Sequence, residues 1–255
     1  MITIISPTTT MNFNKNIKLD TQSVPVFLKD AFYLMSLLKS LSIDDVSNLM
    51  NLSKELSTLN FNRYNNFSTE SNPKCQSILA FDGEVFNCMD VSSFNRYDID
   101  FANKHLKILS GLYGVLSPLD LIEPYRLEMK SKLPNKDGND LYKFWKSKIT
   151  TFIIDELSTH ENKTLVNLAS SEYLKCIDLK KLNDYNFVDI IFKEYDALKD
   201  TYKVKGLYAK KARGYMASYI VKNKIDQIEN LKKFNTDGYT YNSTLSTDNS
   251  FVFTR

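Results

Sequence analysis

The segment Tyr208–Gly214 carries the side chains best suited to binding an anion, namely Lys210, Lys211 and Arg213. It follows a short run typical of a strand and opens a pattern with helical spacing. The amino end of a helix attracts anions through free amides and the helix dipole. Three cations in a first turn oppose that dipole unless an anionic ligand is bound, and Gly214 leaves room for a ligand backbone. A solvated basic face is the alternative.

A glycine pair, Gly111 and Gly114, follows a segment that we expect to be helical up to Leu109. Glycine permits positive φ and lets backbone amides come close to a ligand. The order of helix, glycine turn and apolar restart is similar to a helix-hairpin-helix element, whose loop amides hold DNA phosphates. The spacing is GxxG rather than GxG, so a helix C-cap with a packing turn is the alternative. Tyr113 lies within this turn and is included among the candidate ligand-binding residues.

The connector Pro118–Met129 contains two prolines and alternating charges, which predicts an ordered, non-helical segment. Within it, Tyr125 offers an aromatic face next to Arg126, whose guanidinium is a bidentate phosphate donor. These two residues are candidates for a nucleic-acid contact. An ion pair of Arg126 with Glu123 or Glu128 is the structural alternative.

Metal and nucleophile chemistry have weak support in the sequence. The two histidines, His105 and His160, are far apart, with no cysteine or carboxylate at ligand spacing, so we expect no metal site and no cofactor. Ser6 closes the first strand without a GxSxG motif around it. Glu172 follows a strand, where it would be a general base in a cleft or, as we favour, part of a helix start. Ser6 and Glu172 are therefore candidate cleft residues only.

Helices and strands that must position these residues can be read from apolar spacing and capping signals. Ser42 and Asp45 have the spacing of a capping box. We expect helices at 24–41, after Ser42, and at 52–64, 98–109, 139–157 and 209–224, and strands at 1–5, 77–81, 164–169, 187–192, 202–208 and 251–254. Repeats and long linkers are lacking, so the sequence predicts one α+β domain over residues 1–255 with a basic cleft.

Composition narrows the class of protein. The chain of 255 residues is 43% hydrophobic, which is ample for one large core, and no apolar run is long enough to cross a bilayer. Three widely spaced cysteines indicate a reducing cytoplasm. Residues 1–125 carry 10 basic and 13 acidic side chains, whereas residues 126–255 carry 23 and 17. This asymmetry favours an anionic partner for the second half, with no membrane and no obligate protein partner.

Six motifs occur together in one order along the chain. They are Ser6-Pro7, Leu79-Ala80-Phe81-x-Gly83, LSGLYGVLSPLDLIEPYRLEM at 109–129, Leu141-Tyr142-x-Phe144-Trp145, Asn167-Leu168-Ala169-Ser170-x-Glu172-Tyr173 and Tyr208–Gly214. In this set the chain resembles, almost end to end, the bacterial YaaA family of peroxide-stress proteins. The resemblance implies a one-domain α+β fold with a basic cleft and a helix-hairpin-helix-like element. It also implies binding to duplex or distorted DNA, and a role in limiting free iron and oxidative damage.

Two departures from the family pattern bear on the cleft. Family members follow Ser-Pro with Ala-Lys, whereas Pro7 is followed here by three threonines, so a cleft lysine is absent at Thr9. Where the family has Lys-Gly and a later tyrosine, this chain has Asp82-Gly83 and Phe86. Both changes predict a more acidic rim with lower affinity for phosphate.

Two functions remain open on the sequence alone. The first is a DNA-binding protein rather than an enzyme, with Lys210, Lys211, Arg213 and Arg126 on phosphates. The alternative is an enzyme that acts on a nucleotide or another small anionic metabolite, with Glu172 or Tyr113 transferring protons. An open groove fits a duplex, and a closed pocket of roughly 300–1,000 Å³ fits a metabolite.

Overall fold

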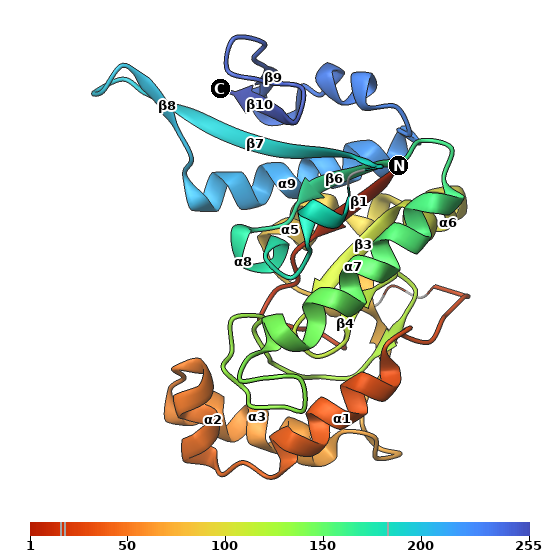
Figure 1. Cartoon of the computed structure of the whole chain (residues 1–255), viewed down its shortest axis with the longest axis vertical. Helices are drawn as coiled ribbons and strands as arrows, with labels where there is room; N and C mark the ends of the chain where they lie inside the picture. Colours follow the sequence, from red (N-terminus) through yellow and green to blue (C-terminus); the bar gives the residue numbers. More distant parts are fainter. Residues whose placement is uncertain (16, 18, 183) are drawn as a thin grey trace.

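A mixed β-sheet forms the centre of the molecule (Figure 1). The computed structural model describes residues 1–15, 17, 19–182 and 184–255. The strands lie in the order β4-β3-β1-β6-β7-β10-β9, and β8 pairs with β7. Neighbours from β3 to β10 run parallel, whereas β4, β8 and β9 are antiparallel to their partners. The bounds are β1 Ile2–Ile5, β3 Leu106–Ser110, β4 Gly114–Leu116, β6 Thr164–Leu168, β7 Asn186–Asp196, β8 Thr201–Lys203, β9 Thr240–Tyr241 and β10 Ser250–Thr254.

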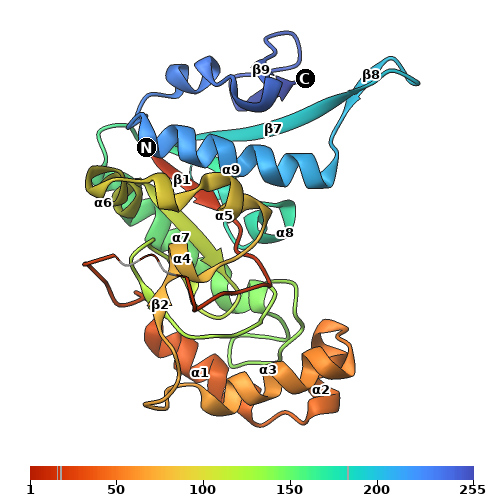
Figure 2. The same ribbon diagram turned by 180° about the vertical axis from the view of Figure 1, so that it is seen from behind.

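Helices cover both faces of this sheet. Helix α7 (Leu141–Thr159) lies on one face, and α5 (Glu84–Met89), α6 (Arg96–His105) and α9 (Gly206–Lys222) lie on the other (Figures 1 and 2). Helix α5 packs along α9. Short helices fill the connections: α8 (Ser171–Leu174) and the 3-10 helices Val91–Ser93, Leu179–Lys181, Ile228–Lys233 and Thr236–Gly238.

A separate group of helices lies at the far end of the molecule, below the sheet in Figure 1. It consists of α1 (Leu28–Lys39), α2 (Ile43–Met50) and α3 (Lys54–Asn66). Ser42 and Asp45 form the predicted capping box at the start of α2. A two-stranded sheet of β2 (Cys75–Gln76) and β5 (Leu121–Ile122) connects this group to the rest. Residues 77–81, predicted as a strand, instead begin with the short helix α4 (Ser77–Ala80).

The strand β1 lies inside the sheet, between β3 and β6, and neither of its faces meets solvent. Its four residues, Ile2–Ile5, are all buried, and three of them are isoleucine, a residue that favours a pleated, packed backbone. β1 pairs with β3 on one side and β6 on the other. The predicted strands at 1–5, 164–169, 187–192 and 251–254 are confirmed within a few residues at their ends.

Besides residues 77–81, two further predicted elements are wrong in type. Residues 106–109, expected as the end of a helix, form β3, because α6 ends at His105 and the apolar run pairs with β1 in the core. A short apolar run fits a buried strand as well as a buried helix. Residues 202–208, expected as a strand, contain only the end of β8, and α9 already begins at Gly206.

One mixed domain is therefore confirmed, although its parallel centre with helices on both faces is closer to the α/β class than to α+β. The expected helix-hairpin-helix-like element is a β-hairpin of β3 and β4. Among the described residues, none of the helices is both long enough and apolar enough to span a bilayer.

Candidate functional site

The strand order reverses at the carboxyl ends of β1 and β6. The chain leaves β1 towards β3 on one side, and it leaves β6 towards β7 on the other. Ligands of open parallel sheets bind at such a reversal of strand order. Ser6 follows β1 and Ser170 follows β6, and the backbone amide of Ser170 donates to Ser6 Oγ at 2.8 Å. The two hydroxyl oxygens are 3.2 Å apart. The structure therefore places Ser6 where ligands bind in this class of sheet.

Asn167 and Asp189, which were not among the candidate site residues, form a polar pair on β6 and its neighbour β7. Asn167 at the end of β6 donates from Nδ2 to Asp189 Oδ1 of β7 at 2.7 Å and accepts from the Ala169 amide at 2.9 Å. Burial lowers the pKa of Arg213, and the nearby Asp189 carboxylate opposes that change. Arg213 Nε is buried without a hydrogen-bond partner among the described residues. A buried guanidinium with a free donor favours an anion. The polar pair Asn167–Asp189 inside apolar strands was the available sequence signal.

The basic start of α9 differs from its prediction. Because the helix begins at Gly206, Lys210 and Lys211 lie in its second turn. The helix dipole acts on charges within the first turn, so it does not oppose these two lysines. Lys210 is exposed, and no carboxylate among the described residues pairs with it. Lys211 Nζ lies 3.9 Å from Glu84 Oε2. Gly214 has a packing role: a Cβ there would lie 2.3 Å from the Val85 carbonyl oxygen of α5.

A projecting arm continues this basic surface. The β7–β8 hairpin extends beyond the body of the molecule in both views (Figures 1 and 2). We define the basic arm as this hairpin and the start of α9, with the lysines Lys199, Lys203, Lys205, Lys210 and Lys211. Lys203 pairs with Asp196. Lys199 and Lys205 are exposed, and no described residue forms an ion pair with either. Leu198 at the tip of the hairpin is 97% exposed.

The hairpin of β3 and β4 is part of the core. A Cβ on Gly111 would lie 2.2 Å from the Leu127 carbonyl oxygen, and one on Gly114, whose φ is +69°, would lie 2.7 Å from the Trp145 ring. Trp145 Nε1 donates to the Gly111 carbonyl at 2.8 Å. Both glycines are buried and pack against the Trp145 indole, so they are not placed to contact a phosphate. This finding corrects the predicted helix-hairpin-helix contact with DNA.

Tyr113 and Tyr125 are buried next to that hairpin. Their rings meet edge to face at 5.4 Å. The Tyr125 hydroxyl lies 2.6 Å from Ser110 Oγ, and the Glu123 amide donates to the Tyr113 hydroxyl at 3.2 Å. Burial raises the pKa of both phenols. In this conformation both side chains are enclosed by protein and offer no face to a ligand.

Arg126 and Glu172 stand at the two ends of a row of paired charges. Arg126 pairs with Glu128 Oε1 at 2.7 Å, Glu128 Oε2 with Lys130 at 2.9 Å, and Lys130 with Glu172 at 4.0 Å. Burial acts to raise the pKa of Glu128, but hydrogen bonds from Lys130 and Arg126 outweigh it and hold the pKa below its usual value. Arg126, Glu128 and Lys130 line a cavity of about 800 Å³ between α2 and segment 126–134. The structural alternative for Arg126, the pair with Glu128, is thus present.

The rim at Asp82 is less acidic than the sequence suggests. Lys15 Nζ lies 3.5 Å from Asp82 Oδ1 and donates to the Phe81 carbonyl at 3.2 Å. Thr8 Oγ1 donates to the Asp82 carbonyl at 3.3 Å. A lysine from elsewhere in the chain therefore offsets the charge of Asp82.

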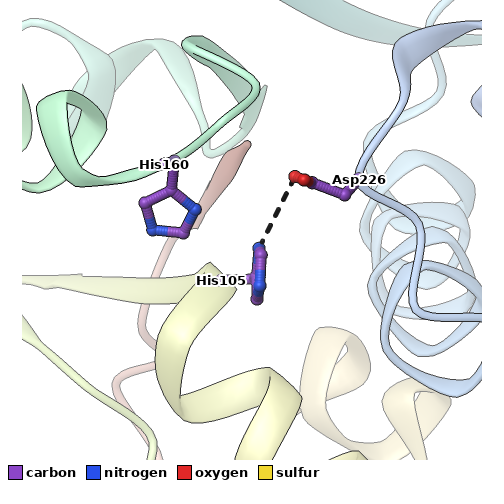
Figure 3. Close-up of side chains that lie close together, drawn as sticks. All are labelled: His105, His160 and Asp226. Carbon is purple, nitrogen blue, oxygen red and sulfur yellow. Dashed lines mark ion pairs between the residues drawn. The ribbon is translucent and has the colours of Figure 1, made fainter.

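The two histidines, expected to be separate, lie together. Their ring centroids are 4.7 Å apart, and Asp226 lies beside them (Figure 3). Burial lowers the pKa of His105, and burial together with the Met1 amino group lowers the pKa of His160 to about 4. The separation of the two histidines in the sequence therefore does not exclude a metal site.

Comparison with known proteins identifies the family. The chain matches the family described as peroxide stress protein YaaA over residues 1–245. It is 46% identical over 256 residues to a UPF0246 protein of Clostridium botulinum (strain Eklund 17B / Type B), covering 100% of this chain and 99% of the relative. UPF0246 proteins of Saccharophagus degradans and Legionella pneumophila (strain Philadelphia 1) are 44% and 43% identical, with the same coverage. The chain therefore belongs to the YaaA family of peroxide stress proteins.

Proposed function

We propose that the protein binds double-stranded or distorted DNA along its phosphate backbone through the basic arm. The observation that carries the proposal is the set of exposed lysines on the arm that lack a carboxylate partner: Lys199, Lys205 and Lys210. An unpaired surface lysine can neutralise a phosphate without first giving up an ion pair. Release of counterions from DNA then favours binding independently of base sequence.

The shape of the arm supports a duplex over a small ligand. A two-stranded ribbon is narrow enough to enter the major groove. Its tip carries Leu198, which is almost fully exposed. Ribbons of this kind enter the major or the minor groove, and proteins that kink DNA insert apolar side chains between base steps from the minor groove. An arm of this kind favours distorted duplexes over straight ones.

Arg126 contributes less than the sequence predicts. Its guanidinium already pairs with Glu128, so a phosphate would have to replace that carboxylate. The Nε of both arginines is buried without a hydrogen-bond partner among the described residues, but only Arg213 has no ion pair with a described residue, so it is the better placed of the two to accept an anion. We therefore assign the backbone contacts to the lysines of the arm and to Arg213.

The cellular role that we propose follows from membership of the peroxide stress family. Bound to DNA, the protein would protect the cell under peroxide and limit the damage that free iron causes. We expect no catalysed reaction to be needed for this role.

A titration of the purified protein tests the proposal. Straight duplex, kinked duplex of the same sequence and ATP are added separately at fixed salt, and binding is followed by fluorescence anisotropy or calorimetry. We expect both duplexes to bind, the kinked one more tightly, and ATP to displace neither at an equal phosphate concentration. Saturable binding of ATP without binding of either duplex would contradict the proposal.

The second candidate is an enzyme that acts on a nucleotide or another small anion, and the reversal of strand order between β1 and β6 favours it. Ser6 and Ser170 lie at the reversal of strand order, and Arg213 lies near Asp189 on the neighbouring strand. Tyr113 is too enclosed to transfer protons there. Glu172, beside Lys130, remains the candidate base. Hydrogen exchange measured with and without ATP distinguishes this candidate. Protection of α9 from exchange when ATP is added would favour the enzyme.

A further inference from the structure

Three side chains from separate elements converge at the amino ends of the parallel strands (Figure 3). His105 ends α6 just before β3, His160 follows α7 before β6, and Asp226 follows α9. One ligand atom from each lies within 4.8 Å of the other two. Tetrahedral Zn²⁺, with bonds of about 2.0–2.2 Å, holds its ligand atoms about 3.4 Å apart. Small side-chain rotations are enough to reach that spacing.

The surrounding packing fixes these side chains in position. The His105 ring stacks on Phe101 with a centroid distance of 4.0 Å and an interplanar angle of 10°. The His160 ring meets His105 edge-on at 81°. Asn162 Nδ2 donates to the Asp226 carbonyl at 2.7 Å, which ties the loop after α9 to the loop after α7. Metal ligands in proteins are typically held in orientation by neighbouring groups of this kind.

The Met1 amino group is a fourth potential ligand at the same place. It lies 2.6 Å from Asp226 Oδ1 and 3.3 Å from His160 Nδ1. In the metal-free protein its ammonium is the cationic partner of Asp226. A metal ion takes over that role, and the neutral amine then becomes a donor. His105 Nδ1 lies 2.8 Å from the Met1 carbonyl oxygen, so a metal at Nδ1 replaces that hydrogen bond.

A cavity of about 430 Å³ gives access to the cluster. It is lined by all three side chains and by Glu156 and Glu161. Two imidazoles and one carboxylate suit Zn²⁺ and other first-row divalent transition metals, and they do not suit Mg²⁺, which prefers six oxygen ligands. We propose that His105, His160 and Asp226 bind one such ion, with Zn²⁺ as the best match. The site is at the opposite edge of the sheet from the Ser6–Ser170 pair and is independent of DNA binding.

Calorimetric titration with Zn²⁺ tests the proposal on protein that carries any tag at its carboxyl end and has been treated with chelator. We expect one Zn²⁺ per chain and no binding of Mg²⁺. Since loss of an outer-shell partner alone costs metal sites about 10–100-fold in affinity, His160→Ala and Asp226→Asn should each weaken Zn²⁺ binding by about 100-fold or more. The matched control is Glu161→Gln, on the same cavity wall, which should stay within about twofold of wild type.

Circular dichroism establishes that each variant is folded, and His160→Gln replaces His160→Ala if the latter is not. As a readout that needs no variant, Co²⁺ should give visible absorption bands with the wild-type protein that Zn²⁺ removes. Three results would overturn the proposal: no stoichiometric Zn²⁺ in wild type, unchanged affinity in the His160 and Asp226 variants, or an equal loss in Glu161→Gln. The cluster would then be an ion-pair network that holds the first strand.

Discussion

At the scale of single residues, neighbours decide what each candidate side chain can do. Arg126 and Arg213 look equivalent in the sequence, and the Nε of each is buried without a hydrogen-bond partner among the described residues, yet Arg126 Nη2 has a carboxylate partner at 2.7 Å, whereas Arg213 forms no ion pair with a described residue. Tyr125, next to Arg126, is enclosed in the core. Side-chain partners of this kind are set by tertiary structure, which is why residue type alone misassigned the role of Tyr125.

The histidine cluster shows the same limit. His105 and His160 are 55 positions apart in the sequence, and Asp226 is more distant still. Parallel strands bring their amino ends to one edge of the sheet, and both histidines precede strands that flank β1. The sequence predicts the strand β6 after His160, but it predicts a helix where β3 follows His105. Because β3 is not predicted as a strand, the sequence does not show that the two histidines lie side by side.

The pKa of Glu128 gives a prediction at this scale. Because the folded pKa lies below its usual value, the carboxylate stabilises the fold above about pH 4.5, and this contribution is lost as the pH falls through the folded pKa. Glu128→Gln should lower the free energy of unfolding by about 1–2 kcal/mol at pH 7, since a hydrogen-bonded charge is removed. The gap between wild type and variant should shrink on acidification to pH 3. Urea unfolding at the two pH values measures it.

Glu55→Gln serves as the control, because Glu55 is an exposed helix residue without an ion pair among the described residues. Its unfolding free energy should follow wild type at both pH values. If the Glu128→Gln gap stayed constant or widened on acidification, Glu128 would not be held ionised by Lys130 and Arg126.

At the scale of elements, local signals predicted those parts that depend on local contacts. The capping box of Ser42 and Asp45 formed as its spacing indicates. The helix predicted at 209–224 is present as α9, and its apolar face, with Ala209, Met216 and Ile220, is buried. The type of residues 106–110 depends instead on pairing with β1, about 100 positions away. Such non-local pairing leaves no periodic trace in a five-residue run.

The β3–β4 hairpin gives a prediction at this scale. Gly114→Ala places a methyl group against Trp145 in a left-handed backbone conformation, so it should lower the free energy of unfolding by about 1–3 kcal/mol. Gly206→Ala, in the first turn of α9 with open space around it, is the matched control and should be neutral or slightly stabilising. Urea unfolding measures both. A Gly114→Ala variant of wild-type stability would contradict the packing role.

At the scale of the whole molecule, charge and topology separate two sites. The excess of basic residues in the second half of the chain was visible in the sequence, and five of its 23 basic side chains lie on the basic arm. The Ser6–Ser170 pair lies at the carboxyl ends of the parallel strands, and the His105–His160–Asp226 cluster lies at their amino ends. DNA binding and metal binding can therefore be altered independently by substitution.

We propose that the lysines of the basic arm hold DNA phosphates. The salt dependence of DNA binding is the most direct test of these contacts. Each neutralised phosphate contributes about −0.9 to the slope of log K against log[salt]. Lys199→Gln combined with Lys210→Gln removes two of the unpaired lysines of the arm, so it should flatten the slope by about 1.8 and weaken binding to all sequences alike. Thermal stability should be unchanged, because both lysines are exposed and form no ion pair with a described residue.

Lys29→Gln combined with Lys54→Gln removes the same charge from α1 and α3, at the other end of the molecule, and should leave the slope unchanged (Figure 1). We predict a flatter slope in the arm variant alone. An arm variant that kept the affinity and slope of wild type, or a control that lost as much, would contradict the account.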